Sequence, residues 1–258
     1  MTESTVLLLL IVVVVAVALF SMRGRAGARR TQLEDAQADA RRWVERLGGQ
    51  VMNLTGTNEP SKQAMADASE RYTAAGSQME QAKTVEQCRL VTKTALEGLY
   101  YVRAARGAMG LDPGPELPVD PEAQRAGQVT EDRRVSVEGH DYEASPAPGR
   151  NTPHYFPGGR VVGRPVPQGW YSEPWWKPAL VAGAWGMGSV LLFSAMFSGM
   201  AGIAGAQAWE SGYDAGQEDA MGGGGEGDMG GDAGGDMGGD FGGGDMGGFG
   251  DMGGGFDF

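Results

Sequence analysis

The residues that could carry acid–base or metal chemistry are few and scattered. His140 and His154 are the only histidines, and Cys88 is the only cysteine. A zinc site needs three or four Cys, His or acidic ligands at paired spacing, and the sequence has none. Cys88 falls on the apolar stripe of a predicted helix, which is typical of a buried, inert thiol rather than of a nucleophile. The sequence therefore predicts no catalytic residue, no metal site and no cofactor.

The motifs that hold phosphate groups are also missing. Gly158-Gly159 and Gly163 form neither a GxxxxGK[ST] loop nor a GxGxxG turn between a strand and a helix. Arg133-Arg134 is an isolated basic pair, whereas nucleic-acid binding requires a clustered basic face. We therefore expect a protein that is not an enzyme and that does not bind nucleic acid.

The charge of the chain is concentrated at its C-terminal end. The net charge of −12 arises in residues 210–258, which hold twelve acids and no base. Asp recurs every fourth residue from 228 to 240 among many glycines, whereas calcium-binding repeats have a period of nine residues. Because glycine offers nothing to bury and like charges repel, we predict a disordered, low-complexity tail. Weak calcium binding and cell-wall binding by this tail stay open.

Two uncharged segments predict transmembrane helices over 4–22 and 178–206, since about 20 apolar residues cross a bilayer. A cleaved signal peptide is the alternative for 4–22. In and beside the second segment, aromatic rings predict a membrane-interface belt, and small residues at every fourth position predict a helix-packing stripe. The belt is Trp170, Tyr171, Trp175, Trp176 and Trp209, and the stripe is Ser194, Ser198, Gly202 and Ala206.

Basic residues near the ends of these segments predict their orientation. Arg23 and Arg25 follow the first segment, and Lys177 directly precedes the second. Basic residues favour the cytoplasmic side, so we expect a two-pass plasma-membrane protein with both termini outside and 22–177 cytoplasmic. A single cysteine agrees with a reducing compartment.

The region 28–110 predicts a helical bundle. Apolar residues recur at intervals of three and four in three stretches, in the pattern of an Ala-rich helical hairpin, a coiled coil or a three-helix bundle. The three stripes are Leu33, Ala36, Ala40, Trp43 and Leu47; Met65, Ala68, Tyr72, Ala75, Met79 and Ala82; and Cys88, Val91, Ala95, Leu99 and Val102. Gly48-Gly49 is expected to end the first helix, and Ser61 and Thr84 to cap the next two. Such a slender core is only marginally stable alone, which favours self-association or a partner.

The remaining cytoplasmic residues predict a linker and a small β region. Residues 111–125 are rich in proline and read as an extended linker. Within 126–168, alternating residues flank Glu138-Gly139-His140 and predict one hairpin, and a second is expected around Pro157-Gly158-Gly159. The expected fold class is therefore mainly α, with two transmembrane helices, the bundle, this small β element and the tail.

Several stretches resemble an uncharacterised family of actinobacterial two-segment membrane proteins. They include RRWVERLGG (41–49), RYTAAGSQMEQA (71–82), EGLYYVRAARGAMGLDPGPELP (97–118), GGRVVGRPVPQGWYSEPWWKPALVAGAW (158–185) and the Gly-Asp-Phe-rich tail. The resemblance implies a helical domain of unknown function and a membrane architecture. It implies no activity, and no functional residue can be carried over from it.

The sequence is compatible with two classes of function. The first is a non-enzymatic scaffold or accessory subunit for other membrane or cell-envelope proteins, with the lipid bilayer and other proteins or a second copy as partners. The alternative is a cell-envelope enzyme or enzyme regulator with a site in 126–168. An enzyme should bring several titratable groups into one pocket, and that region offers few, so we favour the scaffold.

Overall fold

A computed structural model describes residues 3–203, 205 and 209, with side chains from residue 27 onward. All of these residues belong to one compact unit of the chain. The tail 210–258, predicted to be disordered, lies outside the described residues.

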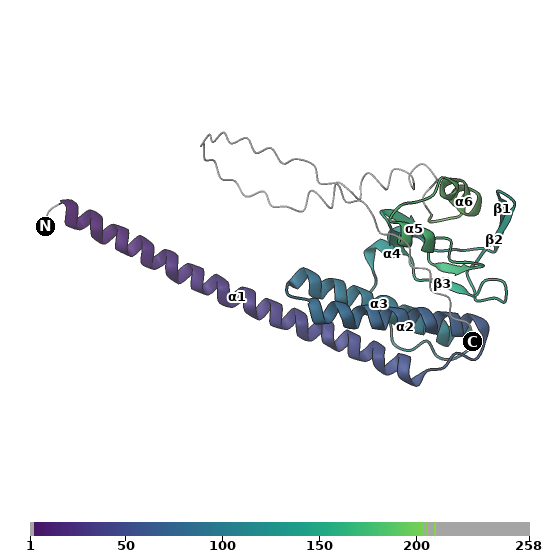
Figure 1. Ribbon diagram of the computed structural model, residues 1–258, viewed down its shortest axis with the longest axis horizontal. Helices are drawn as coiled ribbons and strands as arrows, with labels where there is room; N and C mark the ends of the chain where they lie inside the picture. The colour runs from purple at the N-terminus through teal and green to yellow at the C-terminus, as the bar shows by residue number, and fades with distance from the viewer. Residues whose placement is uncertain (1–2, 204, 206–208, 210–258) are drawn as a thin grey trace, which may run out of the picture. The chain divides into compact units, whose positions relative to one another are not determined.

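Three helices pack against one another in a bundle (Figure 1). They are α1 (Glu3–Asn53), α2 (Glu59–Gln81) and α3 (Val85–Ala108). Only the C-terminal part of α1 lies beside α2 and α3. The apolar stripes read from the sequence line the interior of the bundle. Their buried members are Ala40, Leu47, Met65, Ala68, Ala75, Ala82, Cys88, Val91, Ala95, Leu99 and Val102.

The prediction that Gly48-Gly49 ends the first helix is wrong, because α1 continues through both glycines to Asn53. Gly48 instead serves packing, since a Cβ atom there would lie 2.7 Å from Cε2 of Tyr72 on α2. Gly98 on α3 has the same role against Leu47 of α1, where an added Cβ would lie 2.5 Å from Cδ2. The absence of a side chain at these two positions lets the helices approach closely.

Reciprocal side-chain caps begin α2 and α3. Asn58, not Ser61, is the N-cap of α2; Ser61 stands three residues later, donates its N–H to the Asn58 side chain and accepts the Asn58 N–H. The predicted cap Thr84 is confirmed, and Gln87 completes the same arrangement at α3. Each pair satisfies two backbone N–H groups that a helix start leaves without partners.

The second half of the described chain forms two small antiparallel sheets and three short helices. One sheet has the strand order β1-β2-β6-β3, and the other pairs β4 with β5. In chain order the elements are α4 (Pro121–Ala126), β1 (Arg133–Val137), β2 (His140–Ser145), β3 (His154–Phe156), β4 (Gly159–Val161), β5 (Arg164–Val166), β6 (Gly169–Tyr171), α5 (Lys177–Ala182) and α6 (Gly188–Phe197).

The predicted hairpin around Glu138-Gly139 is present, joining β1 to β2. Both turn residues have positive φ, 54° and 82°, as a tight two-residue hairpin turn requires. The second hairpin turns at Val162-Gly163, so the expected turn at Pro157-Gly158-Gly159 is wrong. β3 ends before those residues and pairs with β6 instead. This pairing skips β4 and β5, so the turn residues next to β3 could not predict it.

No helix within the described part of the chain has both the length and the apolar character that crossing a membrane requires. The expected span 178–206 is divided between α5 and α6, of six and ten residues, because Gly183 adopts a left-handed conformation and ends α5. Residues 4–22 belong to α1, but their side chains lie outside the described residues. The predicted fold with two transmembrane helices is therefore wrong. The predicted two-pass plasma-membrane localisation, with both termini outside and 22–177 cytoplasmic, is wrong for the same reason.

Leu47 is the test of the bundle core, because its side chain is fully buried where α1 meets α3. Replacement by alanine leaves a cavity, so we expect Leu47→Ala to lower the free energy of unfolding by about 2–5 kcal/mol. The exposed Leu90→Ala on α3 is the control and should change it by less than about 0.5 kcal/mol. Urea denaturation followed by circular dichroism measures both; equal effects would contradict the packing of α1.

Candidate functional site

A buried carboxylate joins the helical bundle to the second half of the chain. Asp67 of α2 is only 7% exposed, and its Oδ1 accepts a hydrogen bond from Nζ of Lys177 on α5 at 3.1 Å. Gln63 donates to the other carboxylate oxygen at 3.4 Å. A buried charge without such partners would be strongly destabilising. This contact therefore fixes α5 against α2.

His154 of β3 lies beside this pair. Burial lowers the pKa of His154, because the imidazolium loses hydration there; Asp67 raises the pKa and Lys177 lowers it. Glu173 and Glu59 also raise it, by smaller amounts. His140 contacts Glu173, one of the carboxylates that act on His154, but among the described residues no hydrogen bond or ring contact joins the two histidines.

A second polar group continues along the same helices. Arg71 of α2 pairs with Glu97 of α3 at 3.2 Å, and Tyr101 stands beside them. Burial raises the pKa of Glu97, and the nearby arginine opposes that rise. The ring of Tyr101 meets the ring of Tyr155 on β3 edge to face, with centroids 5.9 Å apart. Burial also raises the pKa of Tyr155 to about 12, so its hydroxyl stays protonated. The hydroxyl oxygen accepts a hydrogen bond from Nε2 of Gln168 at 2.8 Å.

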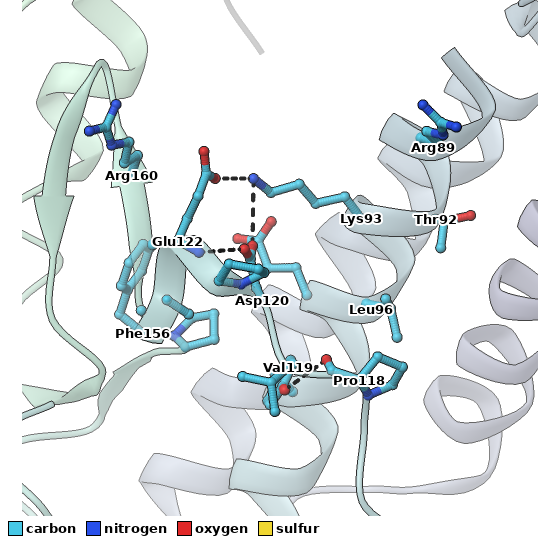
Figure 2. A pocket seen from close by; sticks show the side chains of 17 residues that line it. Arg89, Thr92, Lys93, Leu96, Pro118, Val119, Asp120, Glu122, Phe156 and Arg160 are labelled. Carbon is cyan, nitrogen blue, oxygen red and sulfur yellow. Dashed lines mark hydrogen bonds and ion pairs between the residues drawn. The ribbon is translucent and has the colours of Figure 1, made fainter. Parts of the chain in front are cut away.

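A cavity of about 300 Å³ opens where α3, the residues before α4 and the β3–β4 connection meet (Figure 2). Much of its wall is apolar. This apolar wall comprises Leu96, Pro118, Val119, Pro121, Ala123, Phe156 and Pro157. Gly158 brings the β3–β4 connection close to α4, since a Cβ there would lie 3.3 Å from the Cβ of Ala123.

The acidic side chains around this cavity are engaged in ion pairs. Lys93 of α3 reaches Glu122 and also Asp120, whose Oδ2 lies 3.5 Å from Nζ (Figure 2). Asp120 also caps α4 by accepting the N–H of Glu122 at 2.8 Å. The Pro-rich segment 111–125, expected to be an extended linker, therefore ends in the helix α4 and supplies one wall of the cavity.

The five aromatic residues predicted for a membrane interface lie inside the fold. Each is at most 9% exposed, so they do not form an exposed belt. Trp170 packs on Tyr155, and the others belong to a second core with α6. The five are Trp170, Tyr171, Trp175, Trp176 and Trp209.

The predicted helix-packing stripe does not lie on one helix. Ser194 is in α6, Ser198 is the residue that ends it, and Gly202 lies in a turn with φ of 78°. Ala206 lies outside the described residues. The stripe required a continuous helix from 178 to 206, and the turn after Phe197 removes that helix.

Exposed apolar residues occur in α5, in α6 and in the connection between them. Val181 is 91% exposed, Met187 98% and Leu191 60%, and Leu180 is 47% exposed. We call these residues the exposed apolar segment 180–191. No charged residue occurs between Pro178 and Trp209, so the segment is apolar without charged neighbours in sequence.

The cavity and the ion pair between Asp67 and Lys177 were not predicted from the sequence. The cavity joins α3 to β4, and the contact between Asp67 and Lys177 joins positions 110 residues apart. No local pattern signals such pairs. One local signal did exist on α3. Lys93, Leu96 and Tyr100 follow one another at intervals of three and four, so they share a helix face that is partly apolar and partly charged.

Comparisons of the chain with protein-family models, with curated proteins and with solved structures find no match. The resemblance to an uncharacterised actinobacterial family is thus untested and stays a prediction.

The lowered pKa of His154 makes the stability of the fold depend on pH. Because the folded-state pKa lies below the ordinary value of 6.5, the folded state binds this proton less readily than the unfolded chain. The free energy of unfolding is therefore unaffected by this histidine above about pH 6.5. It falls as the pH drops from there through the folded-state pKa, because only the unfolded chain readily takes up the proton. His154→Gln should therefore lose less stability than the native chain between about pH 7.5 and about pH 5.5. Urea midpoints at both pH values measure this difference, and equal losses would contradict it.

Proposed function

We propose that this chain is a non-enzymatic scaffold or accessory subunit that binds another protein through the exposed apolar segment 180–191. The observation that supports this proposal is the exposure of Val181 and Met187, at 91% and 98%, in a stretch without charge. Apolar side chains exposed together are costly in water and mark interaction sites. Burial of this segment against a partner would remove that cost.

The rigid surroundings of the segment support the same function. α5 is held at its start by the contact of Lys177 with Asp67, and Trp185 between α5 and α6 donates its Nε1–H to the carbonyl of Val161 at 2.9 Å. Phe193 and Phe197 anchor α6 in the core. The exposed side chains therefore project from a fixed base, which lowers the entropic cost of binding.

The alternative, an enzyme or regulator with a site in 126–168, has less support from the geometry. His140 contacts Glu173 at the surface, whereas His154 faces Asp67 and Lys177 at the bundle. Neither histidine lines the cavity of about 300 Å³ beside α3, so these titratable groups do not converge in it. A catalytic site would require such convergence.

Photo-crosslinking tests the proposed binding surface. A benzoylphenylalanine residue replaces Met187 in the full chain, expressed in the cells that make it. The matched control replaces Met52 of α1, which is 74% exposed. We expect one discrete adduct from position 187, none from position 52, and loss of the adduct when Val181→Asp places a charge in the interface.

Several results of this experiment would change the proposal. An adduct of twice the chain mass would identify the partner as a second copy. Equal labelling at positions 52 and 187, or an adduct that survives Val181→Asp, would contradict binding through the segment. Val181 is nearly fully exposed, so the aspartate variant should keep its fold, which circular dichroism checks.

A further inference from the structure

The cavity between α3, α4 and β4 has the composition of a small-molecule site. Its volume of about 300 Å³ lies at the lower end of the range for such sites. Leu96, Val119 and Phe156 give it apolar walls from three separate elements. An apolar body of a ligand would replace water against these walls, and that exchange favours binding.

The charges around the cavity determine which head group a ligand would carry. Glu97 pairs with Arg71, whereas Asp120 and Glu122 share the single cation Lys93. The three acids are therefore engaged in ion pairs, although Lys93 offsets only one of the two charges that it contacts.

Two arginines remain at the rim. Arg89 of α3 and Arg160 of β4 line the cavity, and Figure 2 shows them on opposite sides of it. Both are exposed, and neither has an ion pair with another residue of the described part of the chain. Together with Arg71, the cations around the cavity exceed its three acids by one charge, and the two guanidinium groups place positive charge at the rim. A positive rim attracts an anion, and arginine binds carboxylates through paired N–H groups.

We infer that this cavity binds a small amphiphilic carboxylate, with its apolar body against Leu96, Val119 and Phe156 and its head group at the rim. Because Arg89 and Arg160 lie on opposite sides, one carboxylate contacts one of them at a time, and both raise its local concentration. This site lies on other elements than the exposed apolar segment 180–191 and goes beyond the proposed function.

Octanoate is the probe, and calorimetric titration of the full chain measures its affinity. Two compounds with the same chain length, 1-octanol and octylammonium, vary only the head group. We expect octanoate to bind about tenfold more tightly than octanol, the usual value of one charge-assisted hydrogen bond. Octylammonium should bind more weakly than octanol, because the rim is positive.

Variants locate the site. Arg89→Gln together with Arg160→Gln should reduce octanoate affinity about tenfold, to that of octanol, and should leave octanol binding unchanged. Arg150→Gln, at an exposed arginine outside this cavity, is the matched control. Leu96→Trp fills the cavity and should abolish binding of both compounds; circular dichroism confirms that each variant is folded.

The remaining outcomes overturn the inference. Undetectable octanoate binding would exclude the site, and equal affinities for octanoate and octanol would remove the role of the arginines. Binding that survives Leu96→Trp but is lost in Val181→Asp would assign the ligand to the segment 180–191 instead. That last result would not decide the proposed protein-binding function, which the photo-crosslinking at position 187 tests separately.

Discussion

The buried carboxylate of Asp67 is the constraint on which the two halves of the described chain depend. α2 can bury this side chain against the β region only if a cation arrives with it, because an unpaired buried charge costs several kcal/mol. Lys177 supplies that cation from the first residue of α5. Trp175 and Trp176, the residues immediately before Lys177 in the chain, are buried in the second core.

Aromatic rings form a second core next to Lys177 in the chain. Tyr171 on β6 packs against the rings of Trp175 and Trp176, with centroids 6.3 Å and 5.1 Å apart. Phe193 of α6 stacks on Trp209 at 4.6 Å, and the Trp209 indole N–H reaches the carbonyl of Pro165. Large rings can thus build a core from strands of only three residues, because each ring buries much apolar area.

The sequence allowed the bundle interior to be predicted more fully than any other part. Apolar spacing placed Leu47, Cys88 and Val91 on inward faces, and Thr84 marked a helix start, because these signals are local. The wrong prediction of a transmembrane helix over 178–206 has a physical cause. A charge-free stretch flanked by Trp has the same composition whether lipid or the protein's own strands surround it. The Asp67–Lys177 contact and the cavity depend on distant pairings, for which one sequence offers no periodic signal.

The long separation of those pairings has a consequence for the order of folding. α2 and α3 are joined by Ala82 to Thr84 alone, so their hairpin can close through local contacts, which form fast. The contact between Asp67 and Lys177 spans 110 residues and must close a much larger loop. A nascent chain would therefore present a finished α2–α3 hairpin, with Asp67 still hydrated, before its β half is made. Until the β half is made, the face of the bundle that receives Tyr155, including the ring of Tyr101, stays in contact with water, and chaperones shield apolar surface exposed in this way.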